Sequence, residues 1–173
     1  SEALPFEGMF PVFSRINLGE ADFKAGREPV TFSVAPGLDG VPLICYEVIY
    51  PGFVRSRVGM SANVLLSITN DGWFGRSPGP FHHAAMARLR TIENGISMVR
   101  CANTGMSMIV DQYGRVLGRT RLFEKAVLTR DVPVGRVWTP YSVFGDWVVL
   151  VSLLVVLGAV VAAVCGRLRG SDQ

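Results

Sequence analysis

The residue best placed for chemistry is Cys45. It ends an apolar run at 41–45 that is typical of a short buried strand, and Tyr46 and Glu47 follow it directly. A nucleophile at the carboxyl end of a buried strand is held rigidly and faces the crevice in which α/β sheets bind ligands. Glu47 can hydrogen-bond the backbone or a neighbouring catalytic group. Cys45 is therefore the candidate nucleophile; the alternative is a buried, inert thiol, the commoner fate of a free cysteine.

The other two cysteines are expected to be buried and inert. Cys101 falls within a predicted strand, and Cys165 falls within a long apolar segment near the C-terminus. Cys45 and Cys101 could form a disulfide only if they were adjacent in space, and nothing in the sequence requires this. An odd number of cysteines, three in 173 residues, argues against a disulfide scaffold.

The sequence predicts no metal and no cofactor. His82 and His83 are adjacent on a predicted helix and point in different directions, whereas a metal pair needs histidines four residues apart. No Cys/His set has zinc spacing, and no glycine-rich loop is followed by Lys-Ser or Lys-Thr. The two lysines, Lys24 and Lys125, lie outside apolar runs. Neither is therefore an evident catalytic partner for a thiol.

A polar turn at 70–72 (Asn-Asp-Gly) leads into Trp73 and Phe74. One interpretation is a surface loop closed by an aromatic plug. The other is a pair of aromatic side chains at a strand end, suited to an acyl or other apolar ligand. The residues alone favour neither.

Predicted strands and helices alternate along the chain. Strands are expected at 29–34, 41–45, 63–69, 96–101, 106–111, 116–117 and 126–132, and helices at 51–59 and 80–94. In the second helix, Phe81, Ala85, Leu89 and Ile92 fall at helical spacing, and Gly95 ends it. This alternation predicts a layered α/β domain.

Composition excludes several classes of protein. The chain carries 17 Lys+Arg and 14 Asp+Glu, a formal net charge of +3. Charged residues make up 18% of the chain, below the roughly 25% of an average soluble domain. With 49% hydrophobic residues and a mean hydropathy of +0.34, the chain is not a disordered polyelectrolyte. No run of Lys or Arg supports a nucleic-acid partner.

The excess hydrophobicity lies at the C-terminus. The 19 residues at 147–165 carry no charge, and at about 1.5 Å per residue they nearly match a hydrocarbon core of about 30 Å. This predicts a transmembrane helix, because a buried core helix rarely contains so long an apolar run. Arg167 and Arg169 follow at once. The positive-inside rule then places residues 166–173 in the cytoplasm and 1–146 on the other side of the membrane.

A domain that is translocated ahead of a C-terminal anchor needs an earlier export or membrane segment. No signal peptide is visible, and the chain begins with Ser1 rather than Met. We therefore expect the sequence to be the C-terminal piece of a longer protein.

Four motifs occur in order along the chain: ICYE at 44–47, TNDGWFG at 69–75, GPFHHAAMARLR at 79–90 and RCANTG at 100–105. Together with Thr-Pro-Tyr at 139–141 and a final apolar segment with a basic tail, they resemble the carbon–nitrogen hydrolase (nitrilase) domain of the bacterial apolipoprotein N-acyltransferase family. The resemblance covers residues 1 to about 165.

The resemblance implies a location and a fold. The domain would be a four-layer αββα sandwich on the periplasmic side of the bacterial inner membrane, set on a membrane bundle. This chain would supply part of that α/β sandwich and the last transmembrane helix. The implied boundaries are 1–134 for the partial hydrolase domain, 135–146 for a linker, 147–165 for the transmembrane helix and 166–173 for the cytoplasmic tail.

The resemblance also implies a reaction. The enzyme takes an acyl chain from a membrane phospholipid onto Cys45 as a thioester. It then passes the chain to the α-amino group of the diacylglyceryl-cysteine at the N-terminus of an apolipoprotein. This is covalent catalysis in two half-reactions, with a phospholipid donor, an apolipoprotein acceptor and the membrane as partners.

Individual residues match the family's motifs. Tyr46 and Glu47 match positions that support the nucleophile, and the backbone N–H of Tyr46 is the implied oxyanion donor. Trp73, with Phe74 beside it, matches a position near the acyl site. Glu2 matches a functional loop glutamate, although Ser1 and Ala3 stand where the family usually has Gly and Tyr. The glutamate base and the lysine of the family's triad lie upstream of the matched stretch.

Two other functions remain open. A nitrilase-type amidase tethered to a membrane would share the cysteine at a strand end, although an amidase needs no membrane helix. An inactive, truncated interaction domain would explain the missing base and lysine. We expect residues 1–173 alone to be inactive, because a thiol at neutral pH needs a neighbouring base or cation.

Overall fold

A mixed sheet of six strands, in the order β1-β2-β3-β4-β5-β6, forms the centre of the fold. The computed structural model describes residues 28, 30–59 and 62–170. The strands are β1 (Phe32–Ala35), β2 (Leu38–Ile44), β3 (Val64–Asn70), β4 (Ser97–Asn103), β5 (Met108–Val110) and β6 (Val116–Arg119). β2, β3 and β4 run parallel, and the other neighbours pair antiparallel. The predicted α/β class is confirmed.

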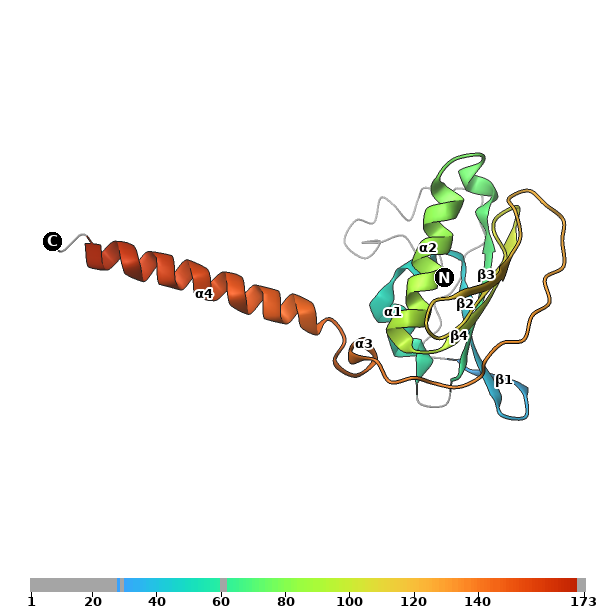
Figure 1. Cartoon of the computed structure of the whole chain (residues 1–173), viewed down its shortest axis with the longest axis horizontal. Coiled ribbons are helices and arrows are strands. Elements are labelled where there is room, and N and C mark those ends of the chain that lie inside the picture. Colours follow the sequence, from blue (N-terminus) through green and yellow to red (C-terminus); the bar gives the residue numbers. More distant parts are fainter. Residues whose placement is uncertain (1–27, 29, 60–61, 171–173) are drawn as a thin grey trace, which may run out of the picture.

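Helices cover one face of this sheet (Figure 1). Parallel neighbours need a crossover connection, and α1 (Pro51–Val58) and α2 (Gly79–Asn94) supply it between β2, β3 and β4. The core between helices and sheet is made of aliphatic side chains and methionines, among them Val41, Leu43, Val48, Val54, Val58, Leu65, Ala84, Ala87, Ile96, Met98 and Val110. Buried runs of this kind form the centre of parallel sheets.

Helix α2 packs against the sheet through a face other than that of the large apolar residues whose spacing predicts the helix. The buried residues of α2 are Pro80, His83, Ala84, Ala87, Arg90, Thr91 and Asn94. Phe81, Leu89 and Ile92, whose spacing predicts the helix, lie on its exposed face. The small side chains of Ala84 and Ala87 allow the helix to approach the sheet closely. The same stripe carries His83 into the interior.

The opposite face of the sheet is open. Ile44, Ile68 and Cys101 are neighbours in the strand register, and 61% of Ile44 and 60% of Ile68 are exposed. Among the described residues, no helix covers this face. The expectation of a buried Cys101 is wrong, because side chains alternate along a strand and Arg100 takes the helix-covered face instead. The described part is therefore one sheet with one helical layer.

One further expectation needs correction. Residues 126–132 form no strand. This segment crosses β6 instead, where Leu128 and Arg130 lie close to Gly118. The predicted linker contains a short helix, α3 (Pro140–Phe144), whose first turn is capped by the Thr139 hydroxyl accepting from the Ser142 N–H at 3.0 Å.

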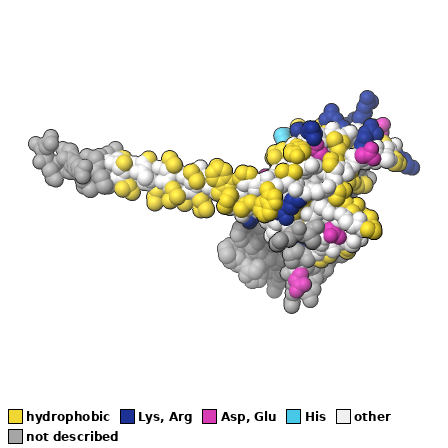
Figure 2. All heavy atoms as spheres, turned by 60° about the horizontal axis from the view of Figure 1, so that its bottom comes forward, with side chains coloured by type: hydrophobic (Ala, Val, Ile, Leu, Met, Phe, Trp, Pro, Cys, Tyr) yellow, Lys and Arg dark blue, Asp and Glu magenta, His cyan; other side chains and the backbone are white. Residues whose placement is uncertain are grey.

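Helix α4 (Trp147–Gly170) leaves the domain after α3. Arg55 ties the junction to α1, because its Nε and Nη2 donate to the carbonyls of Ser142 and Val143 at 3.3 and 2.9 Å. Hydrophobic side chains run along the described part of α4 (Figure 2). Within the stretch whose side chains are described, no helix is both long and apolar enough to span a membrane.

Gly95 ends α2 in a left-handed conformation, at a position with no room for a Cβ. Its φ is +65°, and an added Cβ would overlap the carbonyl oxygen of Val137, whose N–H donates to the Gly95 carbonyl at 2.7 Å. We expect Gly95→Ala to lower the free energy of unfolding by about 2–4 kcal/mol, through backbone strain and loss of that hydrogen bond. Denaturant titration measures this loss. Gly52→Ala is the matched control, since Gly52 lies in α1 with open space around it; an equal loss there would contradict the explanation.

Candidate active site

Cys45 lies at the turn from β2 into the short helix η2 (Cys45–Ile49). Its φ is +51°, a left-handed conformation that is uncommon for a residue with a side chain and recurs at functional sites. Glu47 braces the turn, because its Oε2 accepts from the Ile44 N–H at 2.8 Å. The sequence left open whether Glu47 bonds the backbone or a catalytic group, and the structure shows a bond to the backbone.

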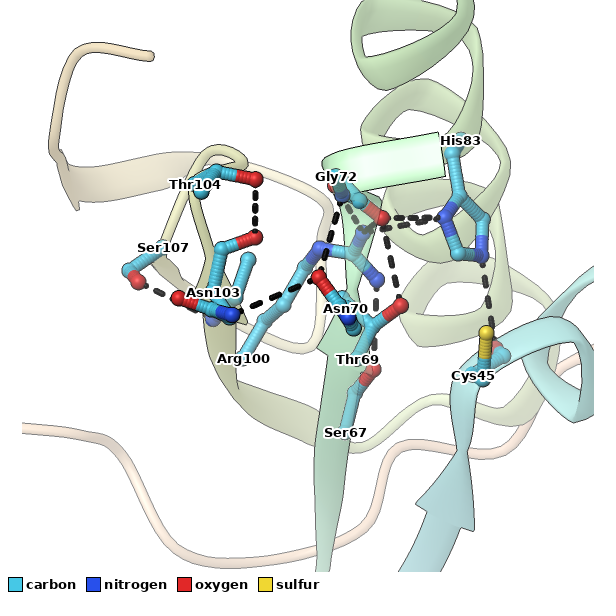
Figure 3. A network of polar contacts seen from close by, with 12 residues as sticks. Cys45, Ser67, Thr69, Asn70, Gly72, His83, Arg100, Asn103, Thr104 and Ser107 are labelled. Atoms are coloured by element: carbon cyan, nitrogen blue, oxygen red, sulfur yellow. Dashed lines mark hydrogen bonds and ion pairs between the residues drawn. The ribbon is translucent and has the colours of Figure 1, made fainter. Parts of the chain in front are cut away.

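Three buried charged or titratable residues, Asp71, His83 and Arg100, form a network next to this turn; Figure 3 labels His83 and Arg100. Asp71 begins the short helix η3 (Asp71–Phe74), His83 lies on α2 and Arg100 on β4; their exposed fractions are 1%, 3% and 2%. The ring Nδ1 of His83 lies 2.9 Å from Asp71 Oδ1, and the ring Nε2 lies 3.3 Å from the Cys45 carbonyl oxygen. Arg100 Nη2 donates to both Asp71 oxygens, at 3.0 and 3.3 Å.

Two hydroxyl groups on β3, those of Ser67 and Thr69, complete this network. Ser67 and Arg100 are direct partners across β3 and β4, and Arg100 Nη1 donates to Ser67 Oγ at 3.3 Å. The Thr69 hydroxyl donates to Asp71 Oδ1 at 3.1 Å. A buried ion pair needs such additional hydrogen bonds to offset the loss of hydration. The network therefore links β3, β4, η3 and α2 to the turn that carries Cys45.

The environment sets the charges of the network. Burial alone would raise the pKa of Asp71, but the hydrogen bond with His83 and the Arg100 charge together hold that pKa below its ordinary value. Asp71 is therefore a carboxylate at neutral pH. Burial lowers the pKa of Arg100, opposed by Asp71 and by the negative charge of a Cys45 thiolate.

An aromatic cluster flanks the nucleophile. The Tyr46 ring stacks on the His83 ring with centroids 5.4 Å apart, and Phe74 meets His83 edge-on at 5.9 Å. Tyr46 and Phe74 lie 6.2 Å apart. Trp73 lies on the same loop but is 80% exposed. Of the two aromatic residues predicted at this loop, Phe74 therefore lies beside the Cys45 turn, whereas Trp73 extends into solvent.

The motif at 100–105 packs against the loop that follows β3. Asn70 Oδ1 accepts from the Gly72 N–H at 3.1 Å and from Asn103 Nδ2 at 3.4 Å. A Cβ on Gly105 would come within 2.7 Å of the Asp71 Cβ, so only glycine fits there. Glycine at this position lets the chain pass directly over the buried carboxylate.

The sequence identified the residues of the Cys45 turn but not the buried residues next to it. Cys45, Tyr46 and Glu47 are consecutive and lie together, whereas Glu2 is outside the described residues. Three residues were missed: Asp71, His83 and Arg100. A signal for them exists, because Asp71 directly follows a buried strand and Arg100 interrupts an otherwise apolar one.

Comparison with known proteins identifies the family of this chain. The family model described as carbon–nitrogen hydrolase matches residues 18–139. The chain belongs to the carbon–nitrogen hydrolase family. It is 37% identical over 166 residues to an apolipoprotein N-acyltransferase of Geobacter metallireducens, covering 96% of this chain and 31% of that protein. It is 40% identical over 175 residues to the apolipoprotein N-acyltransferase of Chlorobaculum tepidum, covering 96% of this chain and 33% of that protein.

These findings confirm the resemblance that the four motifs indicate. The chain spans about a third of the length of those two relatives. Among solved structures, an amidase from Nesterenkonia sp. is similar, with 25% identity and a TM-score of 0.47 over 58% of this chain and 40% of that chain.

Proposed function

We propose that this chain carries the nucleophile of an apolipoprotein N-acyltransferase. The enzyme takes an acyl chain from a membrane phospholipid and passes it, through a thioester on Cys45, to the N-terminal diacylglyceryl-cysteine of an apolipoprotein. The observation that carries the proposal is the strand-end position of Cys45, in a left-handed turn next to the His83–Asp71–Arg100 network. The identity of 37–40% to proteins of that name supports the choice of substrates.

The proposed reaction balances without a cofactor. In the first half-reaction the Cys45 thiolate adds to the ester carbonyl of the phospholipid. The bond from that carbon to the glycerol oxygen then breaks, and the oxygen leaves with a proton as a lysophospholipid. In the second half-reaction the amine of the acceptor adds to the thioester carbonyl, the carbon–sulfur bond breaks, and the amine proton returns to the base. This is ping-pong covalent catalysis.

Each predicted site residue has a role in this proposal. The backbone N–H of Tyr46 stabilises the oxyanion of each tetrahedral intermediate, and Glu47 braces the nucleophile turn. Phe74 and Trp73 contact the acyl chain, and Glu2 takes the role of the functional glutamate that it matches in the family. The glutamate base and the lysine come from residues outside 1–173.

The membrane is part of the proposal. Apart from Ser152, the described side chains of α4 are apolar, and they are exposed up to Ala163; the uncharged run continues to Cys165. We infer that α4 is the transmembrane anchor in the bacterial inner membrane, with the catalytic domain in the periplasm. The open sheet face around Ile44 and Ile68 then receives the second sheet of the αββα sandwich.

The test is an acyl-transfer assay on the complete protein that carries this chain, in membranes. A labelled phospholipid is the donor and a diacylated lipopeptide is the acceptor. We expect a triacylated lipopeptide and, without acceptor, a Cys45 peptide heavier by one acyl group. Hydrolysis of simple amides without acyl transfer would support the amidase instead and would contradict the proposal.

The same assay on residues 1–173 alone tests whether the chain is active without the rest of the protein. We expect no measurable turnover, because the base and the lysine are absent and the open sheet face is unpaired. Turnover within tenfold of the complete protein would show that Glu2, Glu47 or a histidine replaces them.

The orientation of α4 has its own test. If residues 166–173 are cytoplasmic, as Arg167 and Arg169 indicate, a cysteine introduced at Ser171 is protected from a membrane-impermeant thiol reagent in intact cells. A cysteine introduced at Ser56, which is exposed on α1, is the comparison once the outer membrane is permeabilised, because it should label from the periplasm. Labelling at position 171 from outside would contradict the orientation.

A further inference from the structure

The carbonyl of Cys45 has a specific partner in the interior. A carbonyl oxygen can only accept, so the His83 Nε2 at 3.3 Å must carry the hydrogen of this contact. The contact is made to a residue whose φ is +51°, and such a conformation persists only where the surroundings hold it. His83 is therefore placed to hold the backbone of the nucleophile itself.

The ring of His83 is in turn held from the other side. The ring Nδ1 lies 2.9 Å from Asp71 Oδ1 and 3.2 Å from Arg100 Nη2, so both of these side chains fix its place. Arg100 fixes the carboxylate by donating to both of its oxygens, and Tyr46 stacks on the ring face. Contacts at the ring edge and on the ring face therefore fix the imidazole in place, and His83 is only 3% exposed.

We propose that His83 is a positioning residue for Cys45. Its Nε2–H holds the Cys45 carbonyl so that the turn stays left-handed and the thiol stays at the strand end, while Asp71 and Arg100 fix the ring. His83 acts through the backbone and does not touch the substrate. The inference rests on the proposed role of Cys45 as the nucleophile.

Two substitutions separate the two contacts of the ring. In His83→Gln the side-chain amide nitrogen reaches the position of Nε2, so the donor to Cys45 is kept and the contact to Asp71 is lost. In His83→Asn the amide nitrogen takes the position of Nδ1, so the contact to Asp71 is kept and the donor to Cys45 is lost. His82→Asn is the matched control, because His82 is the exposed neighbour on the same helix.

The experiment measures alkylation of single cysteines by iodoacetamide in the complete protein, followed by peptide mass spectrometry. A cysteine introduced at Ser56, which is exposed on α1, serves as the internal reference, with Cys101 changed to Ser. We expect His83→Asn to lower the rate at Cys45 at least tenfold relative to this reference cysteine, with His83→Gln within threefold of the unchanged protein and His82→Asn without effect. In the acyl-transfer assay, His83→Asn should lower kcat by a similar factor and leave KM for the lipopeptide within twofold.

The outcomes are distinguishable. If His83 served only folding, both variants would lose stability and Cys45 would label faster as it became exposed; equal rates for His83→Asn and the unchanged protein would likewise overturn the inference. If Cys45 reacts no faster than the reference cysteine at position 56, the proposed nucleophile itself is wrong. A fast Cys45 without acyl transfer would contradict the proposed substrates and leave the role of His83 standing.

Discussion

Cys45→Ala in the complete protein is expected to abolish acyl transfer. Cys45 is the nucleophile of the proposed reaction, and alanine cannot form the thioester. Cys45→Ser should retain at most roughly one hundredth of the turnover, because a serine hydroxyl is far less ionised than a thiol near pH 7 and needs a stronger base. The measurement is the initial rate of triacylated lipopeptide formation at saturating donor.

The control for these variants is Cys101→Ser. Cys101 lies on the sheet face opposite the helices and the His83–Asp71–Arg100 network, so Cys101→Ser is expected to leave the rate within twofold. Each variant should also keep the unfolding midpoint of the unchanged protein, because a small change at the half-buried Cys45 removes little packing. Normal acyl transfer by Cys45→Ala would contradict the role of the Cys45 thiol. A thioester found on Cys101 would assign the role of nucleophile to Cys101 instead.

The long elements of the fold could be predicted from the sequence. β3 and α2 combine a strong pattern with clear ends: an apolar run closed by Asn-Asp-Gly for β3, and Pro80 and Gly95 at the ends of α2. The strand expected at 126–132 fails because alternation alone does not supply a pairing partner. In the structure that segment crosses β6, where Gly118 leaves room for Leu128.

The site could be predicted only where it is local in sequence. Cys45, Tyr46 and Glu47 are consecutive, so one strand end carries them all. His83 and Arg100 act at the site only because α2 buries its small-residue stripe and because β3 and β4 pair in one register. Both depend on tertiary packing, which the local sequence pattern does not show. The spacing of Phe81, Leu89 and Ile92 predicts the helix, but it does not predict which face of the helix is buried against the sheet.

Arg100→Met is expected to cost the domain about 3–5 kcal/mol of unfolding free energy, since it leaves the buried Asp71 carboxylate without its ion-pair partner. That is a large part of the stability of an ordinary domain, about 5–15 kcal/mol. Asp71→Asn combined with Arg100→Met should cost less than the sum of the two single changes, because no unpaired charge then remains buried. Denaturant titration of the complete protein in detergent measures each loss.

Arg115→Met is the matched control for Arg100→Met. Arg115 also pairs with a buried carboxylate, with its Nε 2.6 Å from Asp111 Oδ2, but its own side chain is 71% exposed. An exposed arginine contributes little through such a pair, so we expect a loss below about 1 kcal/mol. Equal losses for the two variants, or a double variant worse than the sum, would show that the buried charge of Asp71 is not the cause.

Acid provides an independent check on the same carboxylate. The pKa of Asp71 in the folded chain lies below its ordinary value of 3.8, since His83 and Arg100 outweigh the opposing effect of burial. A carboxyl group with a lowered pKa stabilises the fold above its unfolded pKa, and that stabilisation is lost as the pH falls through the folded pKa. The stability difference between the unchanged protein and Asp71→Asn should therefore stay constant from pH 7 to about 5 and shrink below about pH 4. A difference that grows as the pH falls would mean that burial dominates and that Asp71 takes up a proton in the folded state.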